Sequence, residues 1–361
     1  DGIITVIERF YLNYTGQQRS KIKRRKTIFA RMNQAKAIFR QMNILGKARV
    51  PFLFVLDYEL QKPFVIPLDE IDPQQIRYNI NGIGPDYGKP DKLPEKTFFY
   101  PLEADEKHYM QAFKQLMFHL RRGDSYLLNL TMPVPVNTNL NLHQIFDHSQ
   151  ARYKLWLAEE CVVFSPETFV TIQDGKISTF PMKGTIKADR EGADQQLIDD
   201  PKEKAEHYTI VDLLRNDLNS IAVNIRVDKF RFLQKVFTWQ GALWQTSSKI
   251  SGELPANYLD NLGNLFQKLL PAGSISGAPK KRTLELIQEL EKYQRGYYTG
   301  VMGVFDGQNV DSGVMIRFVE QTKNGLVYKA GGGITVNSHA KSEFQELLEK
   351  VYLPFAIQEV K

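Results

Sequence analysis

Several strand-like segments follow one another between residues 160 and 180 with no helix between them. Elsewhere, helical and strand-like patterns mix without the regular strand–helix–strand alternation that builds a parallel sheet. The sequence therefore favours an α+β fold over a doubly wound α/β fold. No linker rich in Pro, Gly or Ser divides residues 50–361, and we expect one domain over residues 32–361.

Helix and strand ranges follow from hydrophobic periodicity and from residues typical of helix ends. Helices are predicted over residues 32–47, 105–122, 200–217 and 279–291, with a last one from Ser338 or Ser342 to Leu353. Strands are predicted over residues 51–58, 126–130, 314–318 and 326–329. Residues 80–100 are rich in Gly, Pro, Lys and Asp, which predicts a surface loop.

The net charge of +6 comes from one end of the chain. Residues 1–50 contain twelve Lys or Arg and two acidic residues, so residues 51–361 carry a net charge of −4. We interpret residues 1–31 as a basic N-terminal segment, either disordered or the product of a start assigned too far upstream. A nucleic-acid partner is not expected, because no nucleic-acid-binding motif follows the basic run at 19–26.

Cys161 is the single cysteine, so no disulfide can form within the chain, as is typical of a reducing compartment. No run of 18 or more apolar residues is present, so no membrane-spanning helix is expected. No apolar segment typical of a secretory signal opens the chain. We therefore expect a cytoplasmic protein without a membrane partner.

Lys183 lies between Pro181 and Gly184, after a strand-like run that ends at Phe180. A lysine that is partly removed from water can lose its proton and act as an amine nucleophile. An ordinary solvated lysine at a strand end would have the same local sequence. Residues 181–185 alone leave both interpretations open.

Two pairs of glutamates lie on predicted helices, each pair with the i, i+3 spacing that places both side chains on one face. Glu203 and Glu206 form the first pair, and Glu343 and Glu346 form the second, with Lys350 on the same face. Carboxylate oxygens from two helices could bind Mg²⁺, which prefers oxygen ligands. Acidic residues at this spacing are also common on solvated helix faces.

Three glycines and an arginine could form an anion site. Gly331, Gly332 and Gly333 follow the predicted strand 326–329, where their N–H groups could enclose an anion or form only a flexible turn. A second loop of small residues, 271–280, leads into a predicted helix. Arg317 interrupts an apolar run, so its guanidinium should have a carboxylate partner in the protein or in a substrate.

Other site types leave no signature in this chain. We find no serine-hydrolase elbow, phosphate-binding P-loop, dinucleotide fingerprint or zinc-ligand spacing. The six histidines are scattered, and His143 with His148 does not form a convincing metal pair.

Seven motifs in order resemble those of the chorismate-binding enzymes, a family that includes anthranilate synthase component I, aminodeoxychorismate synthase component I, isochorismate synthase and salicylate synthase. They are residues 165–167, 181–185, 205–217, 273–280, 316–317, 331–333 and 342–346. The resemblance extends over about residues 105–355, with 122–130 as its first clear segment. It implies two large antiparallel β-sheets that face each other, with helices packed outside.

The same resemblance implies a role for each candidate residue. The Mg²⁺ ligands would be Glu203, Glu206, Glu343 and Glu346. The substrate carboxylates would be held by Arg317, Lys350, Gly331, Gly332 and Gly333, and the ring site would be lined by Thr185, Ser274 and Tyr298. Glu167 resembles the acid/base near the hydroxyl that leaves.

Residue 183 distinguishes the branches of the family. Anthranilate synthases carry a small residue there, whereas a lysine is typical of aminodeoxychorismate synthase. The resemblance then implies that the Lys183 amine attacks C2 of chorismate, and that ammonia from a glutamine amidotransferase subunit gives 4-amino-4-deoxychorismate for p-aminobenzoate and folate synthesis. The alternatives are anthranilate synthase component I, isochorismate synthase and a non-catalytic subunit that binds a partner.

The resemblance also places Gln245 among the substrate-binding residues, at a position where the family usually has a histidine. Glutamine cannot act as a general acid or base at neutral pH. Because that histidine is associated with the enolpyruvyl side chain, its replacement makes pyruvate elimination less expected.

Overall fold

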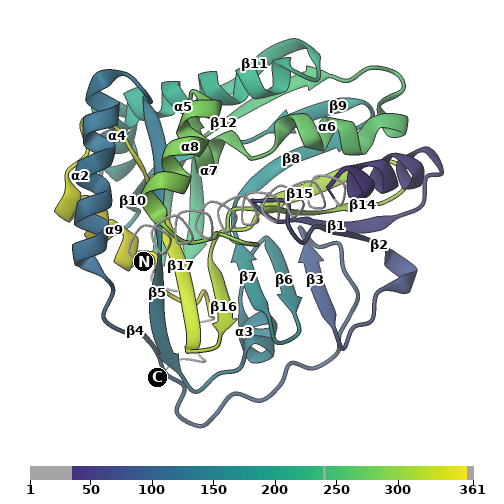
Figure 1. The fold of residues 1–361 in the computed structure, drawn as a ribbon, viewed down its shortest axis with the longest axis horizontal. Coiled ribbons are helices and arrows are strands. Elements are labelled where there is room, and N and C mark those ends of the chain that lie inside the picture. The colour runs from purple at the N-terminus through teal and green to yellow at the C-terminus, as the bar shows by residue number, and fades with distance from the viewer. Residues whose placement is uncertain (1–34, 239–240, 356–361) are drawn as a thin grey trace, which may run out of the picture.

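The structure is a computed structural model that describes residues 35–238 and 241–355 (Figure 1). The predicted basic segment 1–31 and the first residues of the helix predicted over 32–47 lie outside the described residues. Residues 35–47 are helical, as the periodicity predicts. None of the described helices is both long enough and apolar enough to cross a bilayer.

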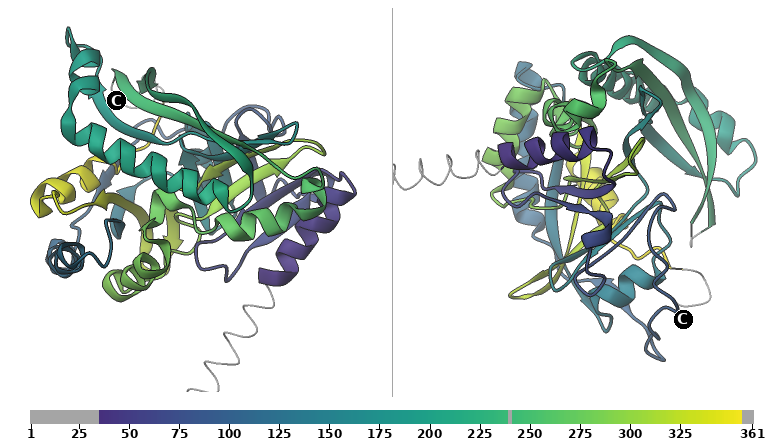
Figure 2. Two further views of the ribbon diagram at one scale, coloured as in Figure 1. Left: turned by 90° about the horizontal axis from the view of Figure 1, so that it is seen from above. Right: turned by 90° about the vertical axis from the view of Figure 1, so that its right-hand side faces the viewer.

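In the described residues, one sheet has nine strands, and its neighbouring strands pair antiparallel. Along the sheet its members are β10 (Met182–Lys187), β12 (Gly241–Glu253), β9 (Lys176–Thr179), β8 (Thr168–Gln173), β15 (Val310–Val314), β14 (Val301–Phe305), β1 (Phe52–Leu56) and β2 (Phe64–Pro67). β11 (Val223–Thr238) pairs with β12 at the edge, and the two form a long hairpin that Figure 2 shows from above.

A second antiparallel sheet has eight strands within the same described ranges. Its order is β13 (Gly277–Ala278), β5 (Leu127–Thr138), β17 (Gly325–Ile334), β16 (Phe318–Thr322), β7 (Cys161–Ser165), β6 (Tyr153–Leu157) and β3 (Ile76–Ile80). β4 (Phe99–Pro101) pairs with the outer end of β5.

The two sheets pack against each other, and β1 shows how. Successive side chains of a strand point to opposite faces of its sheet. Leu53 and Val55 of β1 join a buried cluster with residues of β3, β6 and β7 from the other sheet. Phe52, Phe54 and Leu56 join a second cluster on the helix side. All five residues of β1 are therefore buried, and the predicted strand 51–58 is confirmed.

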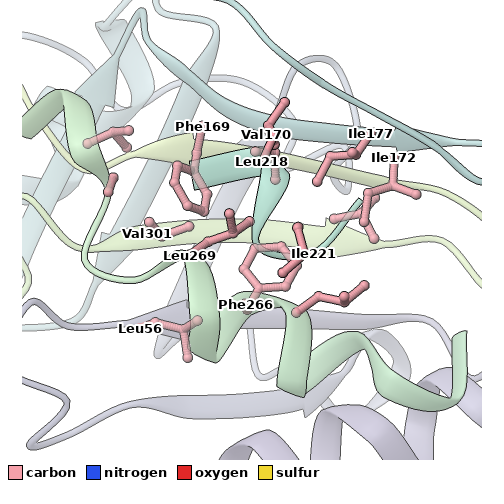
Figure 3. Packing of buried hydrophobic residues seen from close by; sticks show 14 of the residues in the cluster. Leu56, Phe169, Val170, Ile172, Ile177, Leu218, Ile221, Phe266, Leu269 and Val301 are labelled. Atoms are coloured by element: carbon pink, nitrogen blue, oxygen red, sulfur yellow. The ribbon is translucent and has the colours of Figure 1, made fainter. Parts of the chain in front are cut away.

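Helices cover the outer faces of both sheets. The nine-stranded sheet packs on residues 35–47, α5 (Pro201–Asn219) and α6 (Leu262–Leu269), where Phe266 meets Phe169, Leu218 and Ile221 in one apolar cluster (Figure 3). The eight-stranded sheet packs on α2 (Glu106–Arg122), α3 (Leu142–His148), α8 (Lys280–Glu291) and α9 (Ala340–Glu349). Shorter elements are α4 (Ala193–Asp199), α7 (Gly273–Ser276), η1 (Leu68–Glu70) and η2 (Tyr258–Asn261). The prediction of two facing antiparallel sheets with helices outside is confirmed.

Residues at helix ends explain why α2 and α5 begin and end where they do. The Asp105 carboxylate accepts a hydrogen bond from His108 N at 2.9 Å, and Gly123 ends α2 with φ 79°. The Asp200 carboxylate accepts one from Glu203 N at 3.0 Å, and Pro201 is the first residue of α5.

Three local predictions are wrong. The last helix, α9, begins after His339 rather than at Ser338 or Ser342, and it ends at Glu349 rather than Leu353. Residues 271–280 are not simply a loop, since they contain α7 and β13. Residues 314–318 are not one strand, because β15 ends at Val314 and β16 begins at Phe318 in the other sheet.

Candidate active site

A cavity of about 170 Å³ lies where elements of both sheets meet α5 and α7. Its walls bring together residues that are far apart in the sequence. Among the predicted site residues, the lining includes Lys183, Glu167, Ser274, Tyr298, Arg317, Gly331, Gly332, Gly333 and Lys350. The substrate-contacting and catalytic roles of these residues remain predictions.

Lys183 is the second residue of β10, the strand that follows β9 in the chain, and its side chain is partly buried. The register of β10 against β12 shifts between Lys183 and Thr185, where Gly184 has φ 73°. Such a bulge changes the direction of a side chain within a paired strand. The Lys183 amine is directed toward β17, since a Cβ added at Gly333 would lie 3.3 Å from Lys183 Nζ.

Glu167 lies in the same cavity and is hydrogen-bonded to Ser274. The Ser274 hydroxyl donates to Glu167 Oε1 at 2.6 Å. Burial raises the pKa of Glu167, while the Ser274 hydrogen bond and the charge of Lys183 partly oppose the rise. A carboxyl group with a raised pKa next to an amine suits a proton donor and acceptor.

Arg317 lies in the link between β15 and β16, where the chain passes from one sheet to the other, and it has φ 55°. Its Nη1 donates to Lys350 O at 2.6 Å, and its guanidinium stacks on Tyr352 at 4.8 Å. No carboxylate within the described ranges forms an ion pair with Arg317. Because the side chain is partly buried and lines the cavity, its charge suits an anionic ligand there.

The three glycines lie inside β17 and pair with Asn129 to Thr131 of β5, so of the two interpretations left open the flexible turn is wrong, and the anion site stays a prediction. A Cβ added at Gly331 would lie 2.5 Å from Leu130 O, so the position requires glycine. Lys350 Nζ donates to Gly331 O at 3.1 Å and pairs with Glu346 at 2.8 Å. The glycines thus let Lys350 and Lys183 approach the backbone of β17.

Two of the four predicted Mg²⁺ ligands lie beside glycines, one next to Lys183 in the chain and one in the cavity wall. A Cβ added at Gly184 would lie 2.8 Å from Glu203 Oε2, and one added at Gly332 would lie 3.7 Å from Glu343 Oε2. Glu206 and Glu346 lie one turn further along α5 and α9. The four carboxylates are of the donor type that Mg²⁺ prefers, and their role as its ligands stays a prediction. In the part of the chain that the structure describes, no three of them have oxygens within 4.8 Å of one another.

Gln245 lies in β12 opposite Thr185 of β10. Gln245 is partly buried but is not one of the described residues that line the cavity. The side chain of Thr185 lies outside what the structure describes, so its predicted place in the ring site stays a prediction.

A buried ion pair behind the cavity was missed by the sequence interpretation. Arg295 donates to both oxygens of Glu291 at 2.6 and 2.8 Å, to Asn129 O at 2.6 Å and to Ile275 O at 2.9 Å. Asn129 and Ile275 line the cavity, so the pair fixes two of its walls. The i, i+4 spacing of Glu291 and Arg295 was the available signal.

His207 is a second buried residue near the site that the sequence did not single out. It is fully buried in α5, and its Nε2 lies 2.7 Å from Ser248 Oγ. Burial, together with the charges of Arg231 and Lys183, lowers the pKa of His207 to about 4. The imidazole is therefore neutral at physiological pH.

Comparisons with known proteins agree with the fold and the motif order. The family described as chorismate binding enzyme matches residues 69–355. An uncharacterized PabA-like protein of Haemophilus influenzae is 48% identical over 314 residues, which are 87% of this chain and 95% of that protein. Aminodeoxychorismate synthase component 1 of Salmonella typhimurium is 34% identical over 260 residues, 67% of this chain, and the match spans 56% of that longer protein.

Solved structures give the same result. Anthranilate synthase component I from Streptococcus pneumoniae is 26% identical, with a TM-score of 0.60 over 71% of this chain and 59% of that chain. The menaquinone-specific isochorismate synthase MenF from Escherichia coli shares the fold with a TM-score of 0.67 at 16% identity, covering 88% of this chain and 81% of that one. The family match covers most of the described residues and includes all seven motifs, so this chain belongs to the family of chorismate-binding enzymes.

Proposed function

We propose that this chain acts as aminodeoxychorismate synthase component I, which aminates chorismate at C4. The observation that supports this best is the amine of Lys183 on the bulge of β10, directed into a cavity that also contains Glu167 and Arg317. Among the family's branches, a lysine at this position is the feature that favours amination at C4.

The proposed reaction has two displacements. The Lys183 amine forms a C–N bond with C2 of chorismate, both ring double bonds shift by one bond toward C4, and the C4–O bond breaks. Glu167 donates a proton, so the C4 hydroxyl leaves as water. Ammonia then forms a C–N bond at C4, both double bonds shift back, the C2–N bond breaks to release Lys183, and the new ammonium group returns a proton to Glu167. Dividing one difficult substitution into two easier ones is what a covalent nucleophile achieves.

The remaining cavity residues would bind and orient chorismate, which carries two carboxylates. Arg317 and Lys350 supply positive charge, and Gly331 to Gly333 leave room for the ligand beside the backbone. Glu203, Glu206, Glu343 and Glu346 would hold Mg²⁺, which offsets the charge of a substrate carboxylate when bound. Gln245 supplies no proton, so we expect the enolpyruvyl group to be kept rather than eliminated as pyruvate.

The ammonia would come from a glutamine amidotransferase partner. Cys161, the single cysteine of the chain, is fully buried in β7, and burial raises the pKa of its thiol. A buried thiol of this kind is a poor nucleophile, so Cys161 does not suit glutamine hydrolysis. We expect this reaction in the cytoplasm, where both components and chorismate would meet.

Intact-mass spectrometry with chorismate and Mg²⁺ but without ammonia tests the covalent step. We expect a chorismate-derived adduct on Lys183 that Lys183→Ala abolishes and Lys187→Ala, on the same strand, preserves. Full turnover by Lys183→Ala, with no adduct on the unaltered chain, would exclude this mechanism.

The product separates the remaining alternatives. Chorismate with ammonium should give a compound that a lyase converts to p-aminobenzoate. Direct formation of fluorescent anthranilate, or of isochorismate in the absence of ammonia, would assign the chain to another branch. No turnover of chorismate under any condition would favour a non-catalytic subunit.

A further inference from the structure

The loop between β3 and β4 is held against α3, at the end of the eight-stranded sheet shown low in Figure 1. Asp91 N donates to Asp147 Oδ2 at 3.0 Å, and Gln144 Nε2 donates to Lys92 O at 2.9 Å. His148 Nε2 lies 2.6 Å from Asp91 O. The contacts concentrate on Asp91, which brings a loop carboxylate onto the surface of a helix.

Three side chains converge there with metal-ligand geometry. His143 Nδ1 lies 2.8 Å from Asp91 Oδ2 and 3.7 Å from Asp147 Oδ2, and each of the three side chains has a ligand atom within 4.8 Å of one from each of the other two. His143 and Asp147 are i, i+4 on α3, so both face the loop. Ligands about 2.0–2.2 Å from a tetrahedral zinc ion are separated by roughly 3.3–3.6 Å, and the observed distances bracket that range.

The neighbours of these side chains fix their directions. The His143 ring packs edge-on against Trp156 with centroids 4.9 Å apart, which sets where Nδ1 points. Arg77 Nη1 lies 3.5 Å from Asp147 Oδ1, so it pairs with the oxygen that is not the one near His143. Asp147 is 7% exposed and His143 is 18% exposed, whereas Asp91 is 56% exposed. His143 and Asp147 are thus held in place on α3, and the β3–β4 loop supplies Asp91.

We propose that Asp91, His143 and Asp147 form a binding site for a divalent transition-metal ion, with Zn²⁺ as the best match, and that the ion clamps the β3–β4 loop to α3. An imidazole nitrogen with two carboxylate oxygens favours Zn²⁺ or Co²⁺ over Mg²⁺ and Ca²⁺, which take oxygen ligands. Water would complete the coordination of such a partly exposed ion. This site shares no residue with the proposed Mg²⁺ site of four glutamates. It also differs from that site in offering an imidazole nitrogen.

The competing explanation is a proton instead of a metal ion. A protonated His143 could bridge both aspartates and hold the loop with no ion present. The two cases differ in the presence of a chelator, which removes a metal ion but leaves a proton bridge in place.

Zn²⁺ titration of the chelator-treated full chain by calorimetry, at about pH 7.5 and with excess Mg²⁺ to fill the glutamate site, tests the proposal. We expect one Zn²⁺ per chain, and affinity reduced roughly tenfold or more by His143→Ala, Asp147→Asn or Asp91→Asn. His119→Ala is the matched control, because His119 pairs with Asp124 at 2.7 Å but no third ligand joins them among the described residues. The Zn²⁺ affinity of the His119→Ala variant should equal that of the unaltered chain.

Two further readouts locate the ion and its effect. Co²⁺ should quench tryptophan fluorescence, and Trp156→Phe should remove most of that quenching. Zn²⁺ should also slow proteolytic cleavage within residues 86–94, and Asp91→Asn should abolish that protection. Absence of Zn²⁺ binding at micromolar concentrations, or binding that is unaffected by the three substitutions, would overturn the proposal.

Discussion

Glu291→Gln should destabilise the fold strongly, because it leaves the charge of Arg295 buried without a carboxylate. Both side chains of the pair are only 1% exposed. Glu291 Oε1 also accepts hydrogen bonds from Thr131 N at 2.8 Å and Thr131 Oγ1 at 2.9 Å, so water has no access to replace the lost charge. Glutamine keeps the shape of the side chain, which confines the change to its charge and hydrogen bonds.

The size of the effect follows from the burial of the pair. Removing one partner of a buried ion pair costs about 3–5 kcal/mol, a large part of the roughly 5–15 kcal/mol by which domains are stable. In urea unfolding followed by circular dichroism, we expect the urea concentration at the midpoint to fall. The slope of the unfolding free energy against urea concentration should stay constant. Because Arg295 also holds Asn129 and Ile275, turnover should fall at urea concentrations below the transition.

Glu285→Gln is the control for this experiment. Glu285 pairs with Arg282 at 3.0 Å on the same helix, but that pair is solvent-exposed, so its loss should leave the midpoint almost unchanged. If Glu291→Gln and Glu285→Gln lower the midpoint equally, the buried pair does not stabilise the fold and the reasoning is refuted.

Three further outcomes concern the cavity. Ser274→Ala removes the hydrogen bond that lowers the pKa of Glu167, so that pKa rises and the limb of the pH–rate profile governed by Glu167 moves to higher pH; an unchanged profile would contradict this role. Gly184→Ala should abolish most turnover, because its Cβ would meet Glu203 Oε2 at 2.8 Å. Gly192→Ala has the same positive φ of 73° but nothing within 4 Å, so it should cost about 1–2 kcal/mol in urea unfolding and leave turnover intact. Glu206→Gln should raise the Mg²⁺ concentration needed for half-maximal turnover with no change in the urea midpoint; equal Mg²⁺ dependence would remove Glu206 from the proposed ligand set.

The helices and the fold class could be predicted from the sequence, because local signals determine them. Asp105 and Gly123 mark both ends of α2, and Asp200 with Pro201 marks the start of α5. The run of strands near residues 160–180 gave the α+β class without any knowledge of pairing. The arrangement of two facing sheets required the family resemblance, since strand order depends on contacts far apart in the sequence.

The conformation of the site could not be predicted from local sequence. Three consecutive glycines suggest a turn, yet β5 pairs with them and extends β17 through Ile334. Arg317 follows an apolar run that looks like one strand, but the chain changes sheets there. Pairing between distant strands overrides local preference in both places. The i, i+3 spacing of the glutamates placed each pair on one face of a helix. It could not show that Glu203 lies near Gly184 or that Glu343 lies near Gly332.

The link from Val314 to Phe318 sets the gap between the sheets beside the candidate active site. Four Cα-to-Cα steps span at most about 14 Å, and facing sheets pack about 10 Å apart, so the link has little slack. Met315 N donates to Gly300 O at 2.8 Å, and Phe164 N donates to Arg317 O at 3.0 Å, which anchors the link to both layers. The length of this link therefore limits how wide the cavity next to Arg317 can be. A one-residue insertion in the link would raise this upper limit by about 3.5 Å, so the sheets could separate beside Arg317.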